Sequence, residues 1–261
     1  MSLLFAGVLF VLGVVGAFVS GLVGVGGAIV MIPLLLYVPP LLGVGTLDVK
    51  AVAAITMVQV FVAATSGVVA HRRHRAVNLR LAATGGVAMA IGSLSGALAS
   101  HWMRESWLLA IFALMVTAAF VLMLVPTPPP DVTQPADERP YSRTRTVAVG
   151  GGVGLAAGMV GAGGAFLLVP LLLVVVGVPI RVTIGSSLAM TALAATAGVI
   201  GKLATAQVPL GPALLVALGA VPGAQLGAAA SQRLAGGALK SILFGVIVLT
   251  GVRVWWHVLA E

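Results

Sequence analysis

The amino-acid sequence predicts an all-α integral membrane protein made of two inverted-topology repeats of about five helical segments each. First, 60% of the 261 residues are hydrophobic and only 8% are charged, whereas soluble domains carry about 25% charged residues. Second, one Gly-rich apolar stretch occurs twice in the chain. Third, the apolar segments are long and lack the alternation of polar and apolar residues that marks a membrane β-barrel, so helices are the expected spanning structure.

The first repeat covers residues 1–125, with apolar segments at 3–20, 27–38, 51–70, 81–100 and 106–125. No basic residue precedes the first segment, so we interpret it as a retained helix and not as a signal peptide. A linker at 126–145 reads PTPPPDVTQPADERPYSRTR, and its prolines and charges exclude a spanning helix. The second repeat covers residues 146–261, with segments at 146–159, 164–178, 182–201, 210–233 and 239–258.

The repeat is visible in three matching stretches. Residues 21–36 read GLVGVGGAIVMIPLLL and residues 158–173 read GMVGAGGAFLLVPLLL, with ten of sixteen positions identical. AATSGV at 63–68 recurs as AATAGV at 194–199, and five of nine positions agree between 92–100 and 223–231. Chance similarity between Leu/Ala/Gly-rich helices is the alternative, but the common order and nearly constant offset favour duplication, a frequent plan in secondary transporters.

Basic residues predict the orientation in the membrane. The densest run, HRRHR at 71–75, lies between the third and fourth segments and should be cytoplasmic. The linker then also lies in the cytoplasm and the N-terminus outside, in a multi-pass protein of the cell inner membrane. Because each repeat contributes an odd number of crossings, the repeats are antiparallel. This holds whether the first two segments of each repeat span fully or form a Gly-broken hairpin that meets its counterpart near the bilayer midplane.

Six glycines at the centre of the two motifs are candidate substrate-binding positions: Gly24, Gly26, Gly27, Gly161, Gly163 and Gly164. Each glycine costs a helix about 1 kcal/mol relative to Ala, and unwound backbone in a membrane is tolerated only where it is buried or lines a cavity. Short helices restarting at Ala28 and Ala165 would point free N–H groups at a small anion. Close helix packing is the alternative, and it is the better interpretation of Gly92/Gly96 and Gly223/Gly227.

Neutral polar residues within the apolar segments are further candidates for substrate binding: Thr56, Gln59, Ser186, Ser187 and Gln225. The alternative is that the hydroxyls bond carbonyls of their own helix and the glutamines join helices. Thr56 and Ser187 align at an offset of 131 residues, which favours a site role for this pair. Thr65 and Thr196 also align but lie nearer the segment ends.

Lys50 and Arg181 align as well, one at the start of each third segment. They are candidate cationic residues at the two mouths of a pathway, or lysine and arginine anchors that snorkel to the interface. The chain has no cysteine and only four histidines, all at segment ends. We therefore expect no metal site, no cofactor, no catalytic residues and no enzyme activity. Basic residues at segment ends fit membrane orientation better than nucleic-acid binding, so the expected partners are a lipid bilayer and a small anionic substrate, with the oligomeric state open.

On these residues the chain resembles the TauE/SafE sulfite exporter family of membrane permeases. The resemblance rests on the glycine motifs at 21–33 and 158–170, the Ser/Thr-bearing stretches 54–67 and 185–198, and the Gly-rich fourth segments. It implies a permease that exports sulfite or a related small organosulfur oxyanion, with the motif glycines and nearby hydroxyls lining the pathway. No Asp or Glu lies in the middle of a segment, so we expect export to be driven by the membrane potential. An ion-coupled importer of a sulfonate or other small organic anion, or a non-transport membrane scaffold, are the alternatives.

Overall fold

The computed structural model describes residues 2–23, 27–72, 78–125, 141–234 and 236–260, and every regular element within them is helical. The first half contains α1 (Leu3–Val23), α2 (Ala28–Leu41), α3 (Val49–Arg72), α4 (Leu79–Ala99), a short 3-10 turn (Ser100–Trp102) and α5 (Glu105–Leu124). The second half contains α6 (Arg143–Val160), α7 (Ala165–Leu171), a π-helical turn (Leu172–Val176), α8 (Ile180–Ala204), α9 (Leu210–Arg233) and α10 (Gly236–Ala260). The predicted all-α class is confirmed.

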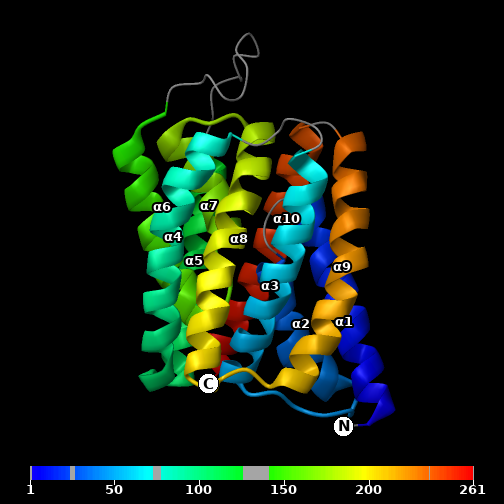
Figure 1. Ribbon diagram of the computed structural model, residues 1–261. Helices are drawn as coiled ribbons and strands as arrows, with labels where there is room; N and C mark the ends of the chain where they lie inside the picture. Colours follow the sequence, from blue (N-terminus) through cyan, green and yellow to red (C-terminus); the bar gives the residue numbers. More distant parts are fainter. Residues whose placement is uncertain (1, 24–26, 73–77, 126–140, 235, 261) are drawn as a thin grey trace.

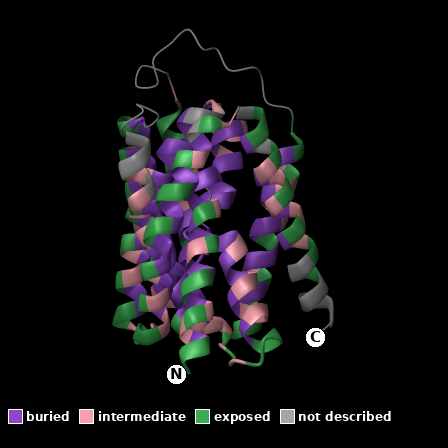
Figure 2. Ribbon diagram, turned by 90° about the vertical axis from the view of Figure 1, so that its right-hand side faces the viewer, coloured by how far each residue is buried: buried purple, intermediate pink, exposed green. Residues whose placement is uncertain are grey.

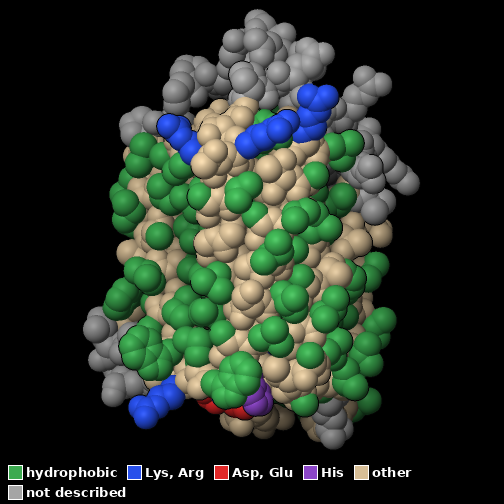
Figure 3. Space-filling model, turned by 60° about the vertical axis from the view of Figure 1, so that its left-hand side comes forward, with side chains coloured by type: hydrophobic (Ala, Val, Ile, Leu, Met, Phe, Trp, Pro, Cys, Tyr) green, Lys and Arg blue, Asp and Glu red, His purple; other side chains and the backbone are tan. Residues whose placement is uncertain are grey.

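Six of the described helices, α1, α3, α4, α5, α8 and α9, are long and apolar enough to cross a bilayer. Large apolar side chains point outward from them, among them Ile91, Leu114 and Leu218, each more than 60% exposed. Figure 3 shows hydrophobic side chains over the wall of the molecule and Lys and Arg side chains at its two ends. An apolar wall between two charged rims is the surface of a multi-pass membrane protein.

Helices of the first half of the chain pack against helices of the second half. α1 lies along α9, α4 lies along α6, and α3 and α8 pack against each other in the middle of the bundle (Figure 1). Every such contact has its counterpart in the other half of the chain, because α1 and α6 are the first helices of the halves and α9 and α4 the fourth. α1 and α6 also begin at opposite faces of the bundle (Figure 1). Inverted repeats would place their first helices in this way, and the duplication itself stays a prediction.

Glycines allow the helix backbones of the two halves to approach each other closely. A Cβ on Gly96 would collide with the backbone carbonyl of Leu155 in α6, and one on Gly227 would collide with that of Phe18 in α1. Gly92 and Gly223 face backbone carbonyls in the same way. The packing interpretation of these four glycines is therefore confirmed, and small residues bring the helix backbones together as in other membrane bundles.

The centre of the bundle is buried and the outward faces are exposed (Figure 2). One difference from the predicted segments lies at the start of the second half. The linker was predicted to run to residue 145, but α6 begins at Arg143. The Ser142 side chain accepts a hydrogen bond from the Arg145 backbone N–H at 3.4 Å, and a serine N-cap of this kind starts a helix before the apolar sequence begins.

Candidate functional site

The two glycine motifs break the helices at the predicted positions. α1 ends at Val23 and α2 begins at Ala28, while α6 ends at Val160 and α7 begins at Ala165. Gly27 has φ 73°, and Gly161, Gly163 and Gly164 have φ 76°, 61° and 74°. This left-handed backbone region favours glycine over residues with a Cβ, so the turns themselves require glycine. Gly24 and Gly26 lie outside the described residues.

Gly27 and Gly163 of the two motifs both approach one segment of α3. A Cβ on Gly27 would be 3.0 Å from Nε2 of Gln59 and 3.1 Å from Cβ of Ser20. A Cβ on Gly163 would collide with Val60 and lie 3.2 Å from Cγ2 of Thr191 in α8. Gln59 and Val60 are consecutive in α3, so both motifs approach the same turn of this helix.

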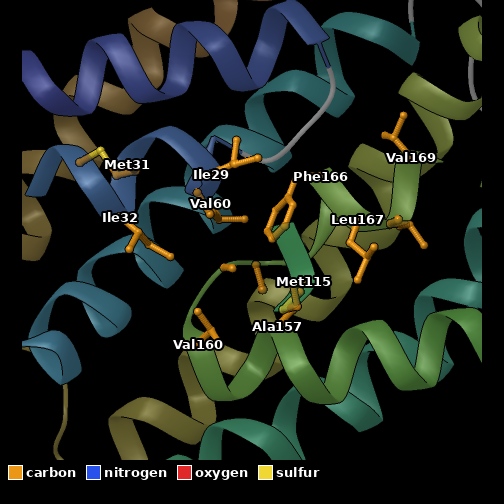
Figure 4. Close-up of a cluster of buried hydrophobic side chains, with 14 of the residues drawn as sticks. Ile29, Met31, Ile32, Val60, Met115, Ala157, Val160, Phe166, Leu167 and Val169 are labelled. Carbon is orange, nitrogen blue, oxygen red and sulfur yellow. The ribbon is translucent and has the colours of Figure 1, made fainter. Parts of the chain in front are cut away.

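The first turns of the two short helices approach the same place. Figure 4 shows Ile29 of α2, Val60 of α3 and Phe166 of α7 in one cluster of buried hydrophobic side chains. Phe166 is completely buried and packs edge-on against Phe112 of α5, with ring centroids 5.9 Å apart. The apolar side chains of these first turns therefore surround the segment of α3 that the glycine turns contact.

Five buried residues around this segment carry polar atoms without a hydrogen-bond partner among the described residues: Ser20, Thr56, Gln59, Ser93 and Thr191. All five are 0% exposed. We call them the central polar cluster. Thr56 lies one turn before Gln59 and Val60, and Ser93 lies beside Met57, because both would touch a Cβ on Gly198. Each member thus reaches residues 56–60 of α3 or the glycine turns beside it.

Unpaired buried polar groups are uncommon, because each costs about 1–3 kcal/mol. Here six such atoms, including both polar atoms of the Gln59 amide, occur together in the middle of the bundle. Hydroxyl and amide groups supply neutral donors and acceptors, and no carboxylate belongs to the set. These unpaired groups make the central polar cluster the candidate site.

Other predicted site residues have different surroundings. Ser186 accepts a hydrogen bond from the Asn78 backbone N–H at 3.0 Å, and so contacts the start of α4. The Ser187 hydroxyl is buried and donates to the Ile184 carbonyl of its own helix at 3.0 Å. Gln225 is exposed on α9. Of the predicted polar residues, the structure thus brings Thr56 and Gln59 into the cluster and places Ser186 and Gln225 elsewhere.

The aligned pair Thr65 and Thr196 also follows the alternative interpretation. Both hydroxyls donate to carbonyls four residues earlier in their own helices, at 2.6 and 2.7 Å, and both side chains are exposed.

Sequence reasoning missed Ser20, Ser93 and Thr191. The repeat comparison gave them no support, because their counterparts are the apolar residues Ala157, Ala224 and Val60. Only the position of Ser20 directly before the first motif was a usable signal.

The two predicted mouth residues lie at opposite faces, at the starts of α3 and α8. Lys50 is half-buried, and its Nζ donates to the His101 carbonyl at 3.0 Å. The side chain of Arg181 lies outside the described residues. Within the described part of the chain, no group of three His, Cys, Asp or Glu side chains is placed to hold a metal ion.

The family model for "Sulfite exporter TauE/SafE" matches residues 9–254. The probable membrane transporter protein YunE of Bacillus subtilis is 23% identical over 272 residues, covering 94% of this chain and 96% of that protein. Two probable membrane transporter proteins of Xylella fastidiosa, from strains Temecula1 and 9a5c, are each 31% identical over 252 residues, covering 94% of this chain and 92% of each relative. No solved structure matches the chain.

Proposed function

The chain belongs to the TauE/SafE sulfite exporter family, and from this premise we propose that it exports sulfite or a related small organosulfur oxyanion through the central polar cluster. The coarser description, a multi-pass membrane permease, rests on the family and on the apolar helices. The substrate, the direction and the driving force are the proposed part. The protein acts by binding and releasing its substrate and has no catalytic step.

The unpaired polar atoms of the central polar cluster carry the proposal. An oxyanion that leaves water must find hydrogen-bond donors, and Gln59, Ser20 and Thr191 provide an amide and hydroxyls beside the two glycine turns. α2 starts beside Gln59, and the first-turn N–H groups and dipole of this helix favour a negative charge there. Because the donors are neutral, the anion is bound without the strong attraction that would hinder its release.

The membrane potential supplies the driving force in this proposal. Two acidic residues, Asp48 and Glu105, lie at the face where α3 and α5 begin, and both accept hydrogen bonds from backbone N–H groups near the start of α3. They support a helix end and are not members of the central polar cluster. A cell interior that is negative by 100 mV drives each negative charge outward with about 2.3 kcal/mol. The N-terminus then lies outside the inner membrane and the linker inside.

The test is sulfite flux from proteoliposomes of the purified full chain, with the membrane potential set by potassium and valinomycin. Gln59→Met removes the amide of the central polar cluster, and Gln225→Met is the matched control because that glutamine is exposed on α9. We expect flux that follows the potential in wild type and in the control, and that falls at least about tenfold in Gln59→Met.

Three results would contradict parts of this proposal. Absence of sulfite flux from folded wild type would exclude sulfite as the substrate. Flux that needs a sodium or proton gradient would contradict export driven by the membrane potential and favour the ion-coupled importer. Equal flux in Gln59→Met and wild type would show that the central polar cluster does not bind the substrate during transport.

A further inference from the structure

A buried lysine lies near the end of α8, away from the central polar cluster. Lys202 is 0% exposed, and its Nζ donates to Oγ of Ser100 at 2.6 Å and to Oε1 of Gln207 at 3.0 Å. A longer contact of 3.4 Å joins Nζ to the Met159 carbonyl. The three hydrogen-bond partners are neutral oxygens, so they orient the ammonium group without neutralising its charge.

A second lysine reaches the same place from the other half of the chain. Nζ of Lys50, at the start of α3, donates to the His101 carbonyl at 3.0 Å. His101 follows Ser100 in the short 3-10 turn after α4, so Lys50 and Lys202 are anchored on consecutive residues of one turn. Like charges repel, so bringing two ammonium groups to one turn costs electrostatic free energy.

The hydrogen-bond partners of both ammonium groups are neutral oxygens. Among the described residues neither lysine forms an ion pair, and the nearby Asp48 and Glu105 accept hydrogen bonds from backbone N–H groups instead. A buried ammonium group without a counter-ion is strongly unfavourable, and such groups in membrane helices usually mark an ion pathway. The buried ammonium group of Lys202 therefore has no anionic partner among the described residues.

The pair lies next to the second glycine turn. Met159, which contacts Lys202, is two residues before Gly161, and a Cβ on Gly161 would collide with the carbonyl of Ala53, one turn after Lys50 in α3. The two ammonium groups thus lie between the turn that borders the central polar cluster and the face where α3 begins.

We propose that Lys50 and Lys202 form a second anion-binding site, at the extracellular end of the pathway, for a small doubly charged oxyanion. This proposal rests on the proposed function for the direction of passage but not for the binding itself. Two ammonium groups whose hydrogen-bond partners are neutral oxygens favour a dianion over a monoanion, and Ser100 and Gln207 keep Lys202 in place when no anion is bound.

The test is thermal unfolding of the detergent-purified full chain, titrated with sodium sulfite or sodium sulfate against sodium gluconate at equal ionic strength. All variants are made in the Gln59→Met background, which suppresses binding at the central polar cluster. Lys50→Gln and Lys202→Gln remove one charge each, and Arg104→Gln is the matched control because Arg104 is exposed at the same face. We expect binding of the dianions to weaken about tenfold in each lysine variant and to stay unchanged in the control.

No stabilisation by either dianion in this background, or equal stabilisation with and without the lysines, would overturn the proposal. If Lys202→Gln does not fold, Lys50→Gln decides, together with Lys202→Arg, which keeps the charge and should keep the binding. The result is separable from the proposed function. Lysine-dependent binding by a protein that moves no sulfite would leave this site standing, and sulfite flux without lysine-dependent binding would refute this site only.

Discussion

Replacing Gln59 with Met removes a completely buried amide whose two polar atoms have no partner among the described residues. The protein itself shows that a thioether fits such a position, because the aligned residue of the second half is Met190, which is also 0% exposed. The side chains have similar length, so the substitution tests the polar atoms and not the packing. We therefore expect Gln59→Met to stabilise the anion-free protein while it impairs transport.

The magnitude follows from the unpaired groups. An unsatisfied buried amide costs about 1–3 kcal/mol, so the free energy of unfolding should rise by about that amount. For a chain of this size each kcal/mol corresponds to about 2–4 °C in Tm. The lost hydrogen bond to a charged ligand is worth about 1.5–3 kcal/mol, which corresponds to about tenfold to 150-fold weaker anion binding.

Thermal unfolding in detergent, without added anion, measures the first effect, and sulfite flux from proteoliposomes measures the second. Gln207→Met is the control, because Gln207 accepts from Lys202 at 3.0 Å and donates to Oγ1 of Thr205 at 2.7 Å. That substitution should lower the Tm. A lower Tm for Gln59→Met would mean that the amide has a structural partner, and the argument that the cluster awaits a ligand would then be refuted.

Three further predictions concern positions with matched controls in the chain. Gly163→Ala should destabilise the protein more than Gly43→Ala, because both glycines have positive φ but only the first would place a Cβ against other atoms; equal losses of Tm would contradict the close contact. Gly96→Ala should lower the Tm through an overpacking cost of about 1–3 kcal/mol, whereas Gly152→Ala, in open space on α6, should raise it slightly. Thr196→Val should leave both Tm and sulfite flux nearly unchanged, since its hydroxyl bonds its own helix, and a large loss of flux would return this residue to the pathway.

Much of the fold could be predicted from the sequence, for local reasons. A run of apolar residues long enough to span a bilayer forms a helix because its backbone must be hydrogen-bonded internally. Glycine lowers helix stability, and α2 and α7 begin after the glycine motifs at Ala28 and Ala165 as predicted, although Gly150, Gly151 and Gly152 lie within α6 without interrupting it. The start of α6 was missed because Ser142, a local cap, extended the helix into polar sequence.

The sequence by itself determined the membrane class, the helix order, the paired glycine breaks and the family. Only the tertiary structure decided which polar residues are buried without a hydrogen-bond partner among the described residues. Ser20 and Thr191 lie on helices far apart in the sequence, and their lack of partners is a property of the packed bundle. Lys202 reads in the sequence as one basic residue among fourteen, and its burial beside Lys50 depends on how the end of α8 meets the turn after α4. The physical reason is that hydropathy and helix propensity act on neighbouring residues, whereas burial and unmet hydrogen bonds arise between elements.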